Sequence, residues 1–241
     1  MITHITQDDF YLKKEANDFY DRWYCNEGKE YDGYLRKSKK SILSILEKNL
    51  ELSGIKVLEV GCFVGDLLNV LKNEHSCKVY GVETSSKACL KCSELFNISL
   101  ENSSFIASSV FRLDQNSKSS FDLIIFDDVL SWMGRGTILQ VLGVTDWLLK
   151  DEGSIFIRDF SPPFSFAFEN HHQKGNGIYN FKQANGHRKF FCESGMYYEK
   201  YSKIYIDVSL QKVVTSRPDS MTWSDSILTK NKTHLFPILE I

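Results

Sequence analysis

The sequence predicts an α/β fold with a doubly wound, mostly parallel sheet that an antiparallel pair of C-terminal strands closes. Three observations predict it. Between residues 55 and 160, apolar runs of strand length alternate with segments of helical periodicity. The first apolar run ends in a glycine turn, and two strand-like runs, 197–207 and 222–229, lie near the C-terminus. Alternation of this kind favours a parallel sheet covered on both faces by right-handed crossovers.

The core elements follow one another in a regular order. Residues 55–60 (IKVLEV) form an apolar run before Gly61, and the next segment has leucines at helical spacing. The pattern then repeats along the chain. The expected strands are 55–60, 78–83, 103–108, 121–127 and 154–159, and the expected helices are 64–73, 86–96 and 136–149.

Composition limits the classes of function. Of the 241 residues, 42% are hydrophobic and 25% are charged, as in an ordinary globular protein. No apolar run approaches the roughly 20 residues that span a bilayer, and the N-terminus lacks the pattern of a secretory signal, so we expect no membrane span and a cytoplasmic location. With 29 basic and 31 acidic residues and no long basic run, we expect no nucleic-acid partner.

The cysteines favour reduced thiols, because six of them are too sparse for a disulfide scaffold. Cys89 and Cys92 form a CxxC motif inside the expected helix 86–96. Their helical spacing favours buried packing residues, and a redox or metal role is the alternative. No second CxxC motif or nearby histidine pair completes a site, so we expect no metal here.

A glycine motif follows the first expected strand, where a parallel α/β sheet binds its ligands. The stretch EVGCFVGD, which begins at Glu59, resembles the first motif of class I S-adenosylmethionine-dependent methyltransferases, an acidic residue followed by three alternate glycines. Gly61 and Gly65 match the first and third glycines, and Phe63 stands at the middle one. The resemblance implies a Rossmann-like fold, with backbone of this turn, including Cys62, against the amino-acid end of the cofactor.

Three later positions agree with the resemblance. Glu83 ends the second expected strand, where an acidic side chain can accept hydrogen bonds from both ribose hydroxyls. Ser109 and Val110 occupy the region that contacts the adenine in the family, and Asp127 resembles the residue that lines the methionine end. The resemblance therefore implies S-adenosylmethionine as the cofactor. The implied contacts are Glu59, Gly61, Cys62, Gly65, Glu83, Ser109, Val110 and Asp127.

Two other functions remain open on this fold. NAD binding is the nearest alternative, but a side chain at the middle glycine would crowd a dinucleotide pyrophosphate, and the chain lacks room for a second catalytic domain. A cofactor-binding module without activity is the other, because Phe63 and Ser109 depart from the usual motif residues.

We expect a single methyltransferase domain over residues 1–241. An amphipathic helix at 36–51 follows an aromatic-rich lead, which suggests a cap, and the segment after strand 154–159 lacks periodicity. The expected parts are an N-terminal helical cap (1–52), a cofactor-binding core (55–160), an acceptor-site insertion (161–195) and the closing strands (196–241).

The aromatic-rich insertion is expected to form the acceptor site, and it contains three of the six histidines. A hydroxyl acceptor needs a general base, and histidine suits that role near neutral pH. We predict that His171 or His172 takes the proton while an acid, Asp159 or Glu169, orients it. A divalent metal held by Asp159 and a histidine is the alternative.

Basic residues in the same insertion allow two interpretations. They could bind a phosphate or a nucleotide-sugar diphosphate, or they could form a solvated face. These residues are Lys174, Lys182, His187, Arg188 and Lys189.

The order of motifs in the insertion, DF-PP and then HH-x-x-G with aromatic residues after it, resembles methyltransferases of bacterial surface-polysaccharide synthesis. This resemblance implies O-methylation of a sugar or polysaccharide precursor. A small-metabolite O- or N-methyltransferase is the broader alternative.

Overall fold

The computed structural model describes residues 7–25, 35–105, 119–169, 175, 177, 179–206 and 222–230. The chain divides into two compact units, Met1–Ser117 and Lys118–Ile241, and each contains parallel strands of its own. The expectation of one domain over the whole chain stays a prediction.

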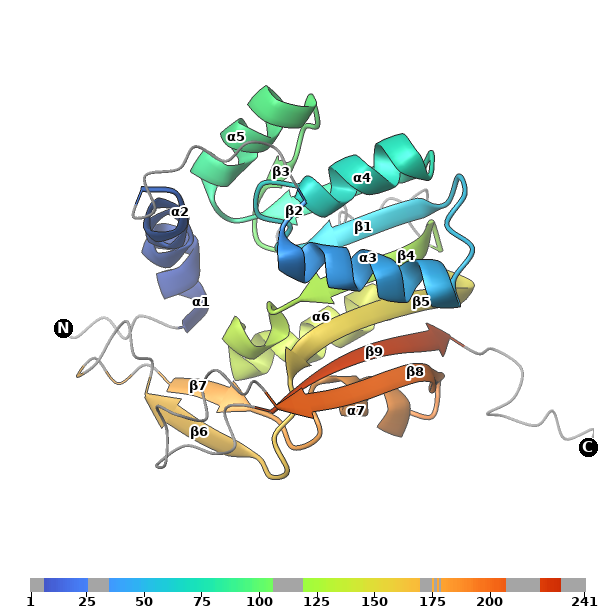
Figure 1. Ribbon diagram of the computed structural model, residues 1–241. Helices are drawn as coiled ribbons and strands as arrows, with labels where there is room; N and C mark the ends of the chain where they lie inside the picture. The colour runs from blue at the N-terminus through green and yellow to red at the C-terminus, as the bar shows by residue number, and fades with distance from the viewer. Residues whose placement is uncertain are drawn as a thin grey trace, which may run out of the picture. The chain divides into compact units, whose positions relative to one another are not determined.

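The first unit combines helices with three parallel strands. β1 (Lys56–Val60) pairs with β2 (Lys78–Glu83), and β2 pairs with β3 (Glu101–Asn102). The helices, blue to green in Figure 1, are α1 (Gln7–Phe10), η1 (Tyr11–Glu15), α2 (Ala16–Cys25), α3 (Lys37–Asn49), α4 (Asp66–Glu74) and α5 (Ser86–Phe96). α4 and α5 supply the crossovers that parallel neighbours require.

Local sequence explains the bounds of α5. Ser85 caps its start by accepting a hydrogen bond from the N–H of Ala88 at 3.2 Å. Asn97 ends the helix in the left-handed conformation, with φ of 50°, which asparagine adopts more readily than most residues. The expected helix 86–96 and the expected strand 78–83 are therefore confirmed.

The second unit begins with a parallel strand pair and ends with antiparallel strands. β4 (Phe121–Asp127) runs parallel to β5 (Leu149–Phe160), β5 is antiparallel to β9 (Thr222–Lys230), and β9 is antiparallel to β8 (Tyr197–Ile206). The expected closing pair of strands is confirmed. The helical segments are η4 (Leu130–Trp132), α6 (Arg135–Leu148) and α7 (Arg188–Glu193).

The segment expected as a loop or small insertion contains a hairpin. β6 (Phe166–Glu169) and β7 (Tyr179–Lys182), orange in Figure 1, pair antiparallel as a separate two-stranded sheet. Along β7, side chains alternate between exposed and buried, so Asn180 and Lys182 lie on the buried side. The insertion therefore places a lysine in the interior of the second unit.

Two expected strands have different bounds. The prediction of a strand at 103–108 is wrong for residues 103–105, because β3 ends at Asn102. Residues 106–108 lie outside the described part. The N–H of Ser103 still donates to the carbonyl of Glu83 at 3.0 Å, but β2 ends at Glu83, so β3 has no partner beyond this point. β5 begins at Leu149 instead of 154. Its pairing with β4 shifts register between Leu149 and Ser154, so the residues between them have no regular partner on β4.

Candidate active site

The glycine turn after β1 is built from left-handed backbone. Gly61 (φ 67°), Phe63 (φ 54°) and Gly65 (φ 72°) all have positive φ values, which glycine adopts without steric cost. The N–H of Gly61 donates to the carbonyl of Val82 at 2.8 Å, and the N–H of Gly65 donates to that of Cys62 at 3.0 Å. The chain therefore reverses tightly at the carboxyl end of β1 and enters α4.

Close packing of two helices adds a second reason for Gly65. A Cβ at this position would lie 2.5 Å from Sγ of Cys92 on α5, and one at Gly81 would lie 2.7 Å from Sγ of Cys62. The Cys62 side chain is fully buried in the core of the first unit. The side chain of Cys62 is therefore part of the core, and the predicted cofactor contacts of Cys62 and Gly65 stay predictions.

The two thiols of the CxxC motif belong to the same packing. Cys92 is fully buried and Cys89 packs against its cluster. Burial raises the pKa of both thiols to about 12, so neither is a reactive thiolate near neutral pH. Among the described residues, no group of His, Cys, Asp and Glu side chains has the arrangement of a metal site.

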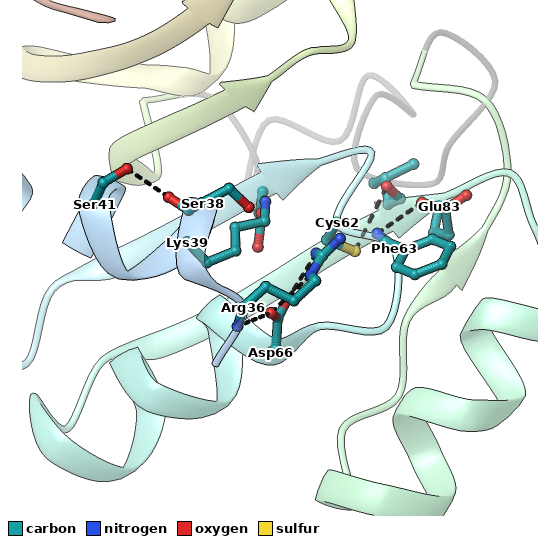
Figure 2. Close-up of polar contacts among 10 residues, drawn as sticks. Arg36, Ser38, Lys39, Ser41, Cys62, Phe63, Asp66 and Glu83 are labelled. Carbon is teal, nitrogen blue, oxygen red and sulfur yellow. Dashed lines mark hydrogen bonds and ion pairs between the residues drawn. The ribbon is translucent and has the colours of Figure 1, made fainter. Parts of the chain in front are cut away.

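The carboxylate of Glu83 fastens this turn to the neighbouring strand (Figure 2). Its Oε2 accepts the N–H of Phe63 at 2.8 Å, and its Oε1 accepts that of Ser85 at 2.7 Å. Desolvation raises the pKa of Glu83, and these two N–H donors oppose that shift. A carboxylate has about four acceptor sites. The hydroxyl of Thr84 is a third, longer donor, at 3.3 Å from Oε1, so Glu83 keeps some acceptor capacity for ribose hydroxyls.

The side chain of Phe63 packs against residues from the N-terminal segment. Its ring centroid lies 5.7 Å from that of Phe19 and 5.8 Å from that of Tyr20, and the guanidinium of Arg36 lies 5.1 Å from it. Arg36 also donates to Asp66 through Nε at 2.9 Å and Nη2 at 2.8 Å (Figure 2). These contacts explain how a large side chain stands at the position of the middle glycine.

Glu59, the acidic residue that opens the motif, is fully buried in an ion pair. Nζ of Lys39 on α3 lies 2.5 Å from its Oε1, and Lys39 is itself 2% exposed. The pair fastens α3 to β1 beside the turn. A direct contact between Glu59 and the cofactor stays a prediction.

In the second unit, two aspartates lie together at the carboxyl ends of parallel strands. Asp127 on β4 is opposite Arg158 on β5, so the next residues, Asp128 and Asp159, are neighbours. Asp128 has a φ of 54° and donates its N–H to the carbonyl of Arg158 at 2.8 Å. Nε1 of Trp132 donates to Oδ1 of Asp128 at 3.0 Å. Asp127, a predicted cofactor contact, ends β4 as expected.

Asp159 is a buried carboxylate with several donors. Its Oδ2 accepts the N–H of Ser131 at 2.9 Å and lies 3.0 Å from Nδ1 of His187. Its Oδ1 accepts the hydroxyl of Ser131 and the N–H of Phe160. Desolvation acts to raise the pKa of Asp159, but His187 and the other partners lower it on balance. The histidine that the structure places beside Asp159 is therefore His187, and the predicted pairing of Asp159 with His171 or His172 stays a prediction.

Lys182 is the least expected member of this group. It is 2% exposed, and its Nζ has no hydrogen-bond partner among the described residues. The nitrogen lies 3.6 Å from the ring centroid of Phe160, 4.5 Å from that of Trp132 and 5.7 Å from that of Phe168. Desolvation lowers the pKa of Lys182 to about 8, although Asp159 and Asp128 act in the opposite direction. We call the rings of Phe160, Trp132 and Phe168 the aromatic box.

The basic residues of the insertion are therefore not one solvated face. That interpretation is wrong for Lys182 and for His187, which is 5% exposed, because the hairpin and α7 turn both side chains inward. Arg188 pairs with a glutamate, Glu199, and Lys189 pairs with Glu193 at 3.1 Å. Four predicted site residues lie outside the described residues, and their roles stay predictions: Ser109, Val110, His171 and His172. Lys174 also lies outside them.

A sequence model of the family described as "Methyltransferase domain" matches residues 51–208, more than half of the chain. The chain belongs to this family. The prediction of an S-adenosylmethionine-dependent methyltransferase is thereby confirmed. This match does not assign the chain to the subtype that modifies sugars or polysaccharides. No curated protein sequence matches the methyltransferase.

Solved structures share its fold at low identity. The Burkholderia thailandensis 1,6-didemethyltoxoflavin-N1-methyltransferase, with S-adenosylhomocysteine bound, is 15% identical with a TM-score of 0.60, over 94% of this chain and 87% of that one. A Haemonchus contortus N-methyltransferase, in complex with phosphomonomethylethanolamine and S-adenosylhomocysteine, is 12% identical with a TM-score of 0.61, over 95% of this chain and 61% of that one.

A third example is the N-methyltransferase NodS of Bradyrhizobium japonicum, in complex with S-adenosylhomocysteine. It is 14% identical with a TM-score of 0.52, over 82% of this chain and 87% of that one. These likenesses confirm the predicted fold class, a Rossmann-like, mostly parallel sheet with antiparallel C-terminal strands. Within the described part of the methyltransferase, no helix is long and apolar enough to cross a bilayer.

Proposed function

We propose that the methyltransferase transfers the methyl group of S-adenosylmethionine to a hydroxyl group of a small acceptor, a sugar or polysaccharide precursor. The cofactor part of the proposal rests on the first unit. The positive-φ turn offers backbone at Gly61 and Gly65, and Glu83 keeps acceptor capacity for the ribose. These groups fit a cofactor that has hydroxyls and an amino-acid end but no phosphate. Ser109, Val110 and Asp127 are proposed as further contacts.

One observation carries the choice of a hydroxyl acceptor. Four ionisable side chains lie together in the second unit, at the carboxyl ends of β4 and β5, where open α/β sheets bind ligands. We call these side chains, which belong to Asp128, Asp159, Lys182 and His187, the ionisable group. A neutral hydroxyl is a weak nucleophile until a base takes its proton, whereas a neutral amine attacks without such help. A group of proton-exchanging side chains therefore favours oxygen over nitrogen as the methylated atom.

Aromatic rings around this group support a sugar as the carrier of the hydroxyl. The rings of Phe160 and Trp223 lie 4.1 Å apart between centroids, and Trp132 lies 6.4 Å from Phe160. The faces of such rings are electron-rich and attract the polarised C–H groups of a sugar ring. We infer that the acceptor enters beside these rings.

A small-metabolite N-methyltransferase is the second candidate. The proteins of similar fold from Burkholderia thailandensis, Haemonchus contortus and Bradyrhizobium japonicum are named as methyltransferases that act on nitrogen. The ionisable group counts only against an amine that binds in its neutral form, because a protonated amine needs a base just as a hydroxyl does.

Turnover on matched acceptors tests the proposal. The purified chain would be incubated with S-adenosylmethionine and UDP-glucose, dTDP-rhamnose or phosphomonomethylethanolamine, and S-adenosylhomocysteine release and product mass would be measured. We expect a methylated sugar nucleotide and no methylated amine. Methylation of the amine alone would favour the second candidate. Cofactor binding without turnover on any acceptor would favour a non-catalytic binding module.

A further inference from the structure

Asp128 combines a strained backbone with a half-buried side chain. Its φ of 54° lies in the left-handed region, which a residue other than glycine adopts at a cost. Only Trp132, among the described residues, donates a hydrogen bond to the Asp128 side chain, and it does so at Oδ1. The other oxygen has capacity for a ligand at the carboxyl end of β4.

The side chains around Asp128 oppose one another in charge. Asp127 precedes it on β4, Asp159 is its neighbour at the end of β5, and Lys182 approaches from β7. His187, the N-cap residue of α7, faces the same group through Asp159. Since Asp159 is held ionised by four hydrogen-bond contacts, the carboxylates repel and Lys182 is the cation that offsets them.

The burial of the Lys182 ammonium lowers the stability of the fold. Its nitrogen has no hydrogen-bond partner among the described residues, and the aromatic box gives it only the attraction of ring faces. A buried, unpartnered ammonium costs free energy, so its placement beside two carboxylates indicates a role in ligand chemistry.

We propose that Asp128 is the base that takes the proton from the acceptor hydroxyl, and that Lys182 is the positioning residue that sets the proton affinity of Asp128. This inference rests on the proposed function. It names a base other than the two histidines that the sequence predicts.

The chemistry balances without any further reactant. As the hydroxyl oxygen forms its bond to the methyl carbon, the bond from that carbon to sulfur breaks, and its electron pair neutralises the sulfonium. The hydroxyl proton passes to Oδ2 of Asp128 and then to water. Desolvation, with repulsion from Asp159, raises the pKa of Asp128 to about 8, against the opposing charge of Lys182. A base with a pKa in this range is matched to its task near neutral pH.

The pH dependence of kcat separates this role from a structural one. Because the ionised carboxylate is the active form, kcat of the full chain with UDP-glucose should rise with pH through the pKa of Asp128. Asp128→Asn should lower kcat by about 10²–10⁴-fold and abolish this rise. Lys182→Met removes the nearby cation, so the rise should move to higher pH. Lys182→Arg keeps the charge and should leave the rise near its original place.

A surface lysine supplies the matched control. Lys200→Met, at an exposed position of β8 outside the proposed site, should leave both kcat and its pH dependence unchanged. Affinity for S-adenosylhomocysteine, measured by calorimetry, should be unchanged in every variant, which shows that each one folds. A rise at the same pH in Lys182→Met, or wild-type kcat in Asp128→Asn, would overturn the inference and leave methyl transfer to the hydroxyl intact.

A titration without turnover keeps the two proposals separate. In protein labelled with ¹³C at the aspartate carboxyl carbons, one resonance should titrate far above the usual aspartate range and be absent from Asp128→Asn. If the Asp128 resonance titrates in the usual range, the inference is wrong whatever the acceptor. If it titrates high but no hydroxyl acceptor is methylated, the proposed function fails and the tuned carboxylate remains.

Discussion

The N–H of Phe63 donates a 2.8 Å hydrogen bond to Oε2 of Glu83, so the side chain that ends β2 also holds the turn that follows β1. Glu83 therefore has two roles in this account. It holds the backbone of the turn, and we propose that it also accepts the ribose hydroxyls of the cofactor. This coupling explains why an acidic residue is needed at the tip of the second strand.

Replacement of Glu83 tests both roles. Glu83→Ala removes the acceptor for the ribose and the support of the turn, so S-adenosylhomocysteine affinity should fall by about 1.5–3 kcal/mol, the scale of hydrogen bonds to a charged group. Titration calorimetry measures the change. Glu94→Ala, at an exposed position of α5, is the control. Unchanged affinity in Glu83→Ala would remove Glu83 from the site.

The second prediction separates backbone strain from packing at Gly65. Gly65→Ala places a Cβ against Sγ of Cys92, whereas Gly54→Ala, at a similar φ of 71°, meets nothing within 4 Å. Both variants should lose about 1–2 kcal/mol through left-handed strain, and Gly65→Ala should lose about 1–3 kcal/mol more through overpacking. Urea unfolding measures the free energies.

A double-mutant cycle with Cys92→Ala assigns the extra loss at Gly65. Cys92→Ala should lessen the effect of Gly65→Ala, because it removes the atom that the new Cβ meets. Equal effects of Gly65→Ala in both backgrounds, or equal losses at Gly54 and Gly65, would show that the packing explanation is wrong.

A third prediction concerns the buried pair of Lys39 and Glu59. Lys39→Met leaves the carboxylate of Glu59 buried without its ammonium partner, so the free energy of unfolding should fall by about 3–5 kcal/mol. The neighbouring Lys40→Met is the control, because Lys40 is exposed on the same helix. Thermal or urea unfolding measures both. Similar stability of the two variants would mean that the pair contributes little.

A fourth prediction decides between the two candidate bases. If His171 or His172 takes the proton, as the sequence predicts, then the double variant His171→Ala/His172→Ala should lose about 10²–10⁴ in kcat. If Asp128 is the base, the double variant should keep the rise of kcat with pH, and Asp128→Asn should lose it. A double variant without the rise, beside an Asp128→Asn variant of wild-type rate, would return the base to the histidines.

Much of the fold could be predicted because its signals are local. The strand bounds at 78–83 and 121–127 follow from apolar runs that a buried parallel strand requires, and α5 follows from its cap and periodicity. β3 could not be bounded in the same way. Its pairing stops where its neighbour β2 ends at Glu83, so the strand ends before the apolar residue Phe105.

The candidate site was predictable only in part. Gly61, Gly65 and Glu83 follow from a motif that is contiguous or at a fixed distance in sequence. Lys182 and His187 could not be found in this way, because a lysine and a histidine in a polar stretch normally face water. Their burial depends on the pairing of β6 with β7 and on the contact of His187 with Asp159, which sequence spacing does not reveal.

The position of bound S-adenosylhomocysteine tests the proposed cofactor site most directly. A crystal structure of the chain grown with S-adenosylhomocysteine would test it. We expect the ribose hydroxyls to donate to the Glu83 carboxylate, with the amino-acid end of the ligand against the backbone of the turn from Gly61 to Gly65. A bound ligand that leaves Glu83 in contact only with the amides of Phe63 and Ser85, and that binds away from this turn, would contradict the account.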